Sequence, residues 1–488
     1  MGMVDRRQFL KAGAVAAASI GSAKASWGSF SPGAFPGPAG ASAEAPDSGK
    51  NLIAHGDSME GVAGALPEGW SIFAGNPALR PSFKLVAGGP GGKSQLLGEG
   101  NGRKECYGYV RIPVRMTPGK WYRMQVRFRF SGIENVNRNL VHGVFSTPDT
   151  LQYNNGIFHY RKDGEWATGE ARFQGPAREM DTEVRLYFRY SAQGQVWWDQ
   201  VLLEEAEPVP SRPVKVAVSW GHGGLKHWEP WLDAAGSRGA DVVLLPELFN
   251  GIWDPPKAEL PGGPSWQLLS SKARQWKMYV SGTTYIRRGD LVYNTAPLFD
   301  RQGKLVGTYD KVMLYDTELD VGVTSGERFP VFDTDFGKIG IITCYDSWFP
   351  DTSRLLALQG AELALLPNEG YYEELMHARA ADNCMCLAVS SGDNPAGVWD
   401  SGGNQAGEER PDPTCAAPNA ILSYEKDEDI RLILATVDLS IKSSPNYWGG
   451  PMRSAPGGRR CRETSPIPLE GRVSELEGLW YTVPKSQA

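Results

Sequence analysis

Two stretches of the chain carry different patterns of hydrophobic and polar residues. Within residues 51–208, every second side chain of Tyr122–Phe130 is apolar, and arginine or glutamine fills the positions between. This period of two predicts a half-buried antiparallel strand. Val184–Tyr190 and Val196–Leu203 are two further predicted strands, and the turn-rich Ser191–Gln195 between them predicts a hairpin. We therefore expect an antiparallel β-sandwich over residues 51–208.

Residues 214–445 show short, continuous apolar runs rich in β-branched residues, which are typical of strands buried on both faces. Segments with helical character separate these runs, and the alternation predicts an α/β domain. The expected strands are Val214–Ser219, Val242–Leu245, Ile339–Thr343, Glu362–Leu366, Asn419–Tyr424 and Leu432–Asp438. The expected helices are Trp228–Arg238 and Ser353–Gln359, the second ended by Gly360.

The two ends of the chain share neither pattern. Residues 1–25 carry Arg6–Arg7 before a modest apolar run, and they resemble a twin-arginine export signal. Residues 26–50 are rich in Gly, Ser, Pro and Ala, which predicts a flexible linker, and residues 446–488 form a tail without a clean period. We expect export to the periplasm or the cell exterior. No stable membrane insertion is expected, because no run approaches the ~20 apolar residues of a spanning helix.

Composition excludes several classes of function. The formal net charge of −6 argues against nucleic acid as a partner. Six cysteines are few for 488 residues, so no disulfide framework is expected. The sequence has no CxxC, HExxH or phosphate-binding glycine loop, and we expect neither a metal nor an organic cofactor.

Three residues that can carry chemistry stand at the ends of apolar runs. Taken singly, Cys344 would be a small core residue, and Glu247 and Lys311 would be surface residues. Together they supply what amide hydrolysis by a thiol needs: a base, a cation for the oxyanion and a nucleophile. Open α/β sheets place such chemistry at the carboxyl ends of their strands.

The segments around these residues resemble the carbon–nitrogen hydrolases of the nitrilase superfamily. The matching motifs are LPELF, YNTAPLFDRQGKLVGTYDKVML and FDTDFGKIGIITCYDSWFPDTSRLLALQGAELALLP. The resemblance implies a four-layer αββα sandwich with Glu247, Lys311 and Cys344 as catalytic triad. It also implies a second catalytic glutamate at Glu318 and an oxyanion donor in the backbone N–H of Tyr345. Finally, it implies a structural pair of Asp346 with Arg354.

Cys-Tyr-Asp resembles the amidase and carbamoylase branches, so the expected reaction is hydrolysis of a linear amide or N-carbamoyl compound. Nitrile hydrolysis and acyl transfer use the same triad and stay open as alternatives.

Glu369, Tyr371, Tyr372 and His377 are candidates for substrate contact in the region that lines the family's pocket. The family's glutamate–asparagine pair is replaced here by Asp382–Asn383. In the family, C-terminal tails like residues 446–488 often cross to a partner subunit, so the resemblance implies a homodimer or higher homo-oligomer.

The first domain resembles jelly-roll modules of the galactose-binding-like and carbohydrate-binding type. The motifs are NLIAHGDSMEG with PEGW, and GQVWWDQVLLEE. We expect its tryptophans either to stack on sugars or to fill the core; these are Trp70, Trp121, Trp197 and Trp198. The domain is expected either to bind a glycan or to serve a structural or dimer-forming role. Two rival functions are a non-catalytic glycan-binding protein and a glycosidase built on Glu247 and Glu318.

Overall fold

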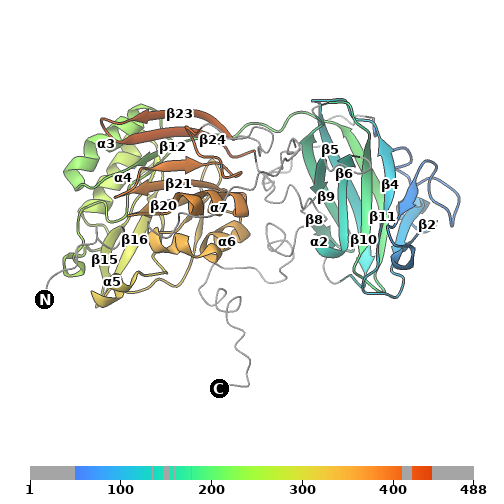
Figure 1. Ribbon diagram of the computed structural model, residues 1–488, viewed down its shortest axis with the longest axis horizontal. Helices are drawn as coiled ribbons and strands as arrows, with labels where there is room; N and C mark the ends of the chain where they lie inside the picture. The colour runs from blue at the N-terminus through green and yellow to red at the C-terminus, as the bar shows by residue number, and fades with distance from the viewer. Residues whose placement is uncertain are drawn as a thin grey trace, which may run out of the picture.

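The computed structural model describes residues 50–133, 136–146, 153–157, 160–176, 178–408 and 420–441. The predicted export signal, nearly all of the predicted linker and the C-terminal tail lie outside these described residues. The described chain forms two bodies, an all-β domain and an α/β domain (Figure 1).

The all-β domain consists of two antiparallel sheets around one core. The sheets have the orders β1-β4-β10-β6-β7 and β2-β3-β11-β5-β9-β8. Their strands are β1 (Ser71–Phe73), β2 (Ser82–Val86), β3 (Gln95–Glu99), β4 (Tyr107–Val114), β5 (Trp121–Ser131), β6 (Leu140–Ser146), β7 (Asn154–Ile157), β8 (Tyr160–Asp163), β9 (Trp166–Gln174), β10 (Thr182–Arg189) and β11 (Gln195–Glu205). Short helical turns are η1 (Pro77–Leu79), η2 (Pro90–Gly92) and α2 (Val136–Asn139). Apolar side chains from both sheets, such as Val126 and Leu186, share the core.

The predicted hairpin between β10 and β11 is wrong. Strand β10 pairs with β4 and β6 in one sheet, whereas β11 pairs with β3 and β5 in the other. The connection Ser191–Gln195 therefore passes from one sheet to the other. A turn signal shows that the chain reverses, but it does not show whether the flanking strands pair.

The tryptophans of this domain divide between core and surface. Trp70 and Trp198 are buried, and their indole N–H groups donate to Ala54 O (3.1 Å) and His142 Nε2 (2.8 Å). Trp197 faces the opposite side of β11, where the Arg129 guanidinium lies 4.7 Å from the ring centroid. Trp121, at the start of β5, is half-buried.

The α/β domain is built on two sheets. The larger has the order β15-β16-β14-β13-β12-β24-β23, with β17 paired to β16, and the smaller has the order β18-β19-β20-β21-β22. The strands are β12 (Pro213–Ser219), β13 (Val242–Leu244), β14 (Tyr279–Ser281), β15 (Thr284–Arg288), β16 (Leu291–Phe299), β17 (Leu305–Asp310), β18 (Val331–Asp333), β19 (Lys338–Ile341), β20 (Leu363–Asn368), β21 (Cys386–Ser391), β22 (Gly397–Trp399), β23 (Ile421–Asp427) and β24 (Leu432–Asp438). The helices are α3 (Leu225–Ser237), α4 (Pro264–Trp276), α5 (Asp316–Asp320), α6 (Pro350–Gln359) and α7 (Glu373–Asn383), with short 3₁₀ turns η3 (Pro255–Lys257) and η4 (Cys344–Trp348).

Four layers follow from how the apolar side chains pack. Val216 and Leu244 of the larger sheet share one core with Ile341 and Leu365 of the smaller sheet. Helices α3 and α4 cover the other face of the larger sheet with a second core, whereas α6 and α7 lie against the smaller sheet (Figure 1). The predicted α/β class and its αββα layering are thus found in this domain.

Local sequence explains why the elements begin and end where they do. Helix α6 starts with Pro350 at its first position, where the missing N–H costs nothing, and ends at Gly360, whose φ of 100° is left-handed.

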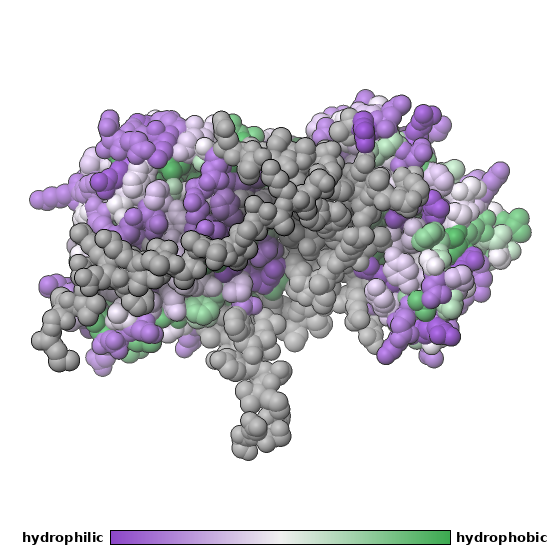
Figure 2. All heavy atoms as spheres, viewed as in Figure 1, coloured by the Kyte–Doolittle hydropathy of each residue, from purple (hydrophilic) through white to green (hydrophobic). Residues whose placement is uncertain are grey.

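Hydrophilic residues cover most of the α/β domain on the face seen in Figure 2. Among the described residues, no helix is long and apolar enough to cross a membrane.

Candidate active site

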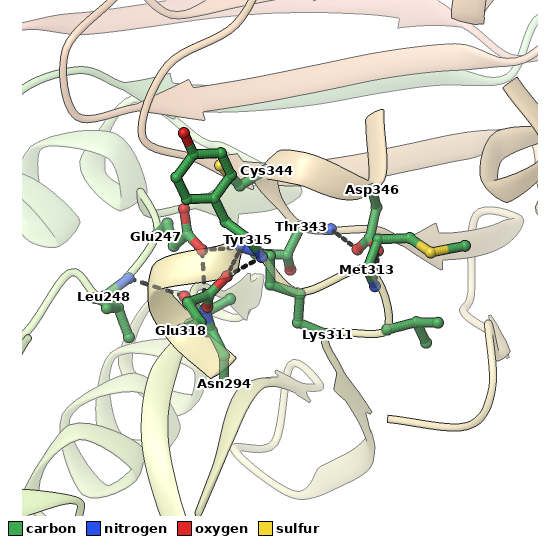
Figure 3. Close-up of polar contacts among 12 residues, drawn as sticks. Glu247, Leu248, Asn294, Lys311, Met313, Tyr315, Glu318, Thr343, Cys344 and Asp346 are labelled. Atoms are coloured by element: carbon green, nitrogen blue, oxygen red, sulfur yellow. Dashed lines mark hydrogen bonds and ion pairs between the residues drawn. The ribbon is translucent and has the colours of Figure 1, made fainter. Parts of the chain in front are cut away.

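The three predicted triad residues meet at one place in the α/β domain. Glu247 follows β13, Lys311 directly follows β17, and Cys344 follows β19. Figure 3 shows these side chains gathered in one cluster with Glu318 of α5. The turn after Glu247 is tight: Leu248 has a φ of 48°, and its N–H donates to Thr283 Oγ1 over 2.8 Å. The structure thus brings together all four residues that were predicted as catalytic.

The ammonium of Lys311 links two carboxylates. Its Nζ lies 2.9 Å from Glu247 Oε1 and 2.6 Å from Glu318 Oε2, and the lysine is only 1% exposed. Asn294 Nδ2 donates to both glutamates as well, over 2.8 Å and 3.1 Å. Burial alone would lower the pKa of Lys311, but the charges of Glu247, Cys344 and Glu318 raise it well above its usual range. The lysine is therefore a permanent cation.

Glu318 is fixed by its place in helix α5. It is the third residue of this short helix, and its Oε2 accepts the backbone N–H of Tyr315 over 3.0 Å in a capping box. The same oxygen accepts the Lys311 ammonium. A helix cap thus orients the second carboxylate of the site.

Cys344 occupies a strained turn. Its φ is 46°, in the left-handed region that side chains rarely adopt, at the first position of η4. Asp346 holds the turn: its carboxylate accepts the Thr343 N–H (2.7 Å), the Met313 N–H (2.8 Å) and the Tyr309 hydroxyl (2.5 Å). One buried carboxylate therefore connects the nucleophile turn to the segment that follows Lys311.

The expected structural pair of Asp346 with Arg354 is corrected. Asp346 is held by the donors named above, and the arginine that braces this turn is Arg379 of α7. Its guanidinium donates to the carbonyls of Ser347 (2.9 Å) and Trp348 (3.1 Å). Short spacing in the sequence favoured Arg354, but packing of α7 against η4 brings in a more distant residue.

The environment of Cys344 keeps its thiol protonated. Desolvation is the largest cause that raises the pKa of Cys344, and the charge of Glu247 raises it further. Lys311 and the backbone N–H of Glu369 act in the opposite direction. The residue itself is partly exposed. A thiol in this state needs a base when it attacks, and Glu247 lies beside it.

The predicted oxyanion and substrate contacts have different surroundings. Tyr345 directly follows the nucleophile, and its ring packs edge-on against Tyr315, 5.3 Å between centroids. The Tyr371 hydroxyl donates to Pro395 O over 2.5 Å, and His377 Nδ1 lies 2.7 Å from Gly403 O. These two side chains support the loop from Pro395 to Gly403. Tyr372 is 49% exposed, and its ring lies 5.0 Å from that of Trp348.

Glu369 lies with two residues that sequence reasoning missed. His222 Nε2 lies 3.2 Å from Asp393 Oδ1 and 3.6 Å from Glu369 Oε1. His222 follows β12, Glu369 follows β20 and Asp393 follows β21. The signal that would have found them is the one that marks Glu247 and Cys344: a polar residue just beyond a buried strand. These three residues are close enough to hold a metal ion, as are Glu373, His377 and Glu408.

Asn294 and Asn383 complete the polar interior. Asn294 was not predicted, because a single polar residue within β16 carries no distinctive pattern. Asp382–Asn383 stands where the family usually has a glutamate–asparagine pair. Asn383 is buried, and its Nδ2 donates to Ser353 Oγ over 3.1 Å, which connects α7 to α6. Asn383 therefore contributes to the packing of these two helices.

The fold and the site define the class: an αββα sandwich in which a thiol, a buried lysine and two glutamates converge. Residues 221–396 match the family model described as carbon-nitrogen hydrolase. A hydrolase of Schizosaccharomyces pombe, C26A3.11, is 30% identical over 43% of this chain and 70% of its own length. The chain belongs to the carbon-nitrogen hydrolase family.

Other relatives and solved structures match over parts of the chain. The chloroplastic omega-amidase of Arabidopsis thaliana is 30% identical over 44% of this chain, and the human omega-amidase NIT2 is 30% identical over 32%. The chain spans 64% of the length of each, less than two thirds. The crystal structure of Saccharomyces cerevisiae Nit3 is 24% identical, with a TM-score of 0.41 over 48% of this chain and 94% of its own. An amidase from Nesterenkonia sp. is 21% identical, with a TM-score of 0.41 over 56% and 98%.

Proposed function

We propose that the protein is a thiol amidohydrolase that cleaves a non-peptide C–N bond in a linear amide or an N-carbamoyl compound. One observation carries the proposal: the Lys311 ammonium is held between Glu247 and Glu318 beside the thiol of Cys344. A fixed cation at this position stabilises negative charge on a carbonyl oxygen, and a carboxylate beside the thiol accepts its proton. The omega-amidases among the relatives support an amide as the substrate.

The first half of the reaction forms a thioester. Glu247 takes the thiol proton while Cys344 Sγ bonds to the carbonyl carbon, and the carbonyl oxygen becomes an oxyanion. Lys311 and the backbone N–H of Tyr345 stabilise that oxyanion. When the tetrahedral intermediate collapses, the C–N bond breaks, and Glu247 returns its proton to the departing nitrogen. Ammonia or an amine leaves.

The second half regenerates the enzyme. Glu247 takes a proton from water, whose oxygen attacks the thioester carbon, and Lys311 again stabilises the oxyanion. The C–S bond then breaks, Cys344 recovers its proton from Glu247, and the carboxylic acid leaves. Glu318 supports both halves because it holds Lys311 in place through a 2.6 Å contact. No step requires a metal or an organic cofactor.

Two rival reactions use the same triad. A nitrile would react through the same thiol, and an amine that replaced water would make the protein an acyltransferase. The glycosidase alternative is disfavoured, because Glu247 and Glu318 are 5% and 8% exposed and both are bound to Lys311. A glycosidase needs one of its carboxyl groups protonated against the leaving oxygen. A purely glycan-binding protein would have no need for this buried charged group.

Export and assembly belong to the same proposal. Residues 1–25 would direct the chain through the twin-arginine route, and the all-β domain would bind a glycan or contribute to a homodimer. Trp121 and Trp197 are the candidates for a sugar contact among the four tryptophans, because both are half-buried whereas Trp70 and Trp198 belong to the core.

Ammonia release by three proteins tests the reaction: the wild type, Cys344→Ala and Cys106→Ala. The substrates are carbamoyl amino acids, linear amides and nitriles. We expect Cys344→Ala to fold normally by circular dichroism and to lose turnover, and Cys106→Ala, altered in the all-β domain, to keep it. Substantial turnover by purified Cys344→Ala would refute the mechanism. Hydrolysis of nitriles alone would favour the first rival reaction.

A further inference from the structure

A rim beside the nucleophile is formed by the chain segments that follow three strands. Gly221 N–H donates to Ser391 O (2.9 Å), Ser391 Oγ donates to Glu369 O (2.9 Å), and Asp393 N–H donates to the same carbonyl (2.7 Å). These bonds join the ends of β12, β20 and β21. They fix the positions of His222, Glu369 and Asp393 relative to one another.

The rim is continuous with the thiol site. The Glu247 N–H donates to Asn368 O over 3.3 Å, and the backbone N–H of Glu369 lowers the pKa of the Cys344 thiol, so the segment that carries the rim carboxylate also borders the thiol site. Asn368, the preceding residue, is fully buried, and its Nδ2 has no acceptor within hydrogen-bonding distance among the described residues. A buried hydrogen-bond donor is thus available immediately before Glu369.

Gly392 makes room for the charged side chains. A Cβ at this position would lie 2.3 Å from Glu369 Oε2 and 2.6 Å from His222 Cε1, closer than real Cβ contacts allow. A residue with a side chain would displace the carboxylate, the imidazole or both. The absence of a side chain at this position therefore permits the arrangement of the rim.

The chemistry of the rim favours a cation. Two carboxylates face one imidazole, and the indole of Trp253, 39% exposed, lies 6.4 Å from the His222 ring between centroids. Carboxylates make their strongest hydrogen bonds to charged donors, and an indole face attracts ammonium and guanidinium groups. An anionic group would meet two like charges here.

We propose that the substrate of Cys344 carries an ammonium or guanidinium group, bound by Glu369 and Asp393 beside Trp253 while its amide lies at the thiol. This inference rests on the proposed amidohydrolase function and names the substrate class. The cationic group lies on the part of the substrate that extends from the reacting carbonyl toward the rim.

Three amides of similar shape test it: 4-aminobutanamide (cationic), pentanamide (neutral) and succinamate (anionic). For the full chain, we expect kcat/KM for the cationic amide to exceed that for the neutral one by at least about tenfold, equivalent to ~1.4 kcal/mol. Asp393→Asn and Glu369→Gln should each lower this ratio severalfold. Glu374→Gln is the matched control, since it removes an exposed carboxylate from the neighbouring helix α7.

The outcomes separate this inference from the function on which it rests. Hydrolysis of the neutral or anionic amide at an equal or higher rate overturns the cationic substrate but leaves the amidohydrolase intact. Ammonia release from none of these amides, nor from the wider substrate set, refutes both. An unchanged ratio in Asp393→Asn, whose side chain is exposed and whose replacement is not expected to disturb folding, overturns the role of the rim. Selectivity that disappears in EDTA and returns with Zn²⁺ would identify the ligand as a metal ion and overturn the proposal.

Discussion

Lys311→Met removes the cation that contacts the buried carboxylates of Glu247 and Glu318, and it should both destabilise the protein and abolish turnover. At an effective dielectric constant of about 20, the contacts of 2.9 Å to Glu247 and 2.6 Å to Glu318 each correspond to about 6 kcal/mol of attraction before desolvation. Removal of one member of a buried charged group typically costs about 3–5 kcal/mol, because the remaining charges are left uncompensated. We expect this loss in the free energy of unfolding at pH 8. Methionine keeps most of the side-chain volume, so the loss is electrostatic in origin.

Urea unfolding at pH 8 provides the assay. Lys338→Met is the control: Lys338 pairs with the exposed Asp333, and surface pairs contribute only about 0–1 kcal/mol. Unchanged stability of Lys311→Met at pH 8, or a loss no larger than that of Lys338→Met, would refute the charge argument.

Two other predictions follow from the pKa shifts of buried groups. Desolvation and the charge of Glu247 both raise the pKa of Cys344, so Glu247→Gln should lower that pKa and speed alkylation of Cys344 by iodoacetamide at pH 8. Mass spectrometry measures the alkylation rate, and a rate equal to or slower than that of the wild type would contradict this prediction. Burial lowers the pKa of His142 from its usual 6.5 to about 3, a difference worth up to about 5 kcal/mol. That stability is present above pH 6.5 and lost as the pH falls toward 3, so the free energy of unfolding of His142→Gln should fall less steeply over this pH range than that of the wild type. Acid unfolding followed by fluorescence that is identical in both proteins would rule out this contribution.

The sequence was sufficient to place Glu247 and Cys344 because each stands just beyond a strongly apolar run, whereas Lys311 follows the partly exposed strand β17 and was predicted from the family resemblance. Burial on both faces makes strands β13 and β19 recognisable without knowledge of their neighbours, and each has a parallel neighbour in its own sheet. The observed strands begin or end within a few residues of the predicted ones: β19 covers Lys338–Ile341 where Ile339–Thr343 was expected. The two displaced residues, Ile342 and Thr343, form the approach to the strained turn.

Contacts that depend on packing between distant segments could not be predicted. Arg379 reaches the carbonyls of the nucleophile turn only because α7 packs against it, and no local spacing encodes that contact. The route of the chain after β10 is a similar case. Five turn-forming residues can close a hairpin or connect two sheets, and the choice depends on which arrangement completes the shared core.

In the proposed enzyme, the residues for chemistry and the residues for specificity stand mostly on different segments. The positions of Cys344 and Lys311 are coupled, because Asp346 accepts the backbone N–H of Thr343 beside the thiol and that of Met313 beside the lysine. Asp346 is fully buried, and this burial raises the pKa of its carboxyl to about 6. The rim residues His222 and Asp393 stand on other segments. Substitution there can change which substrate is held without moving the thiol or the lysine. Only Glu369 belongs to both parts, through its backbone at the thiol and its carboxylate at the rim, so its side chain can be altered while its backbone contact remains.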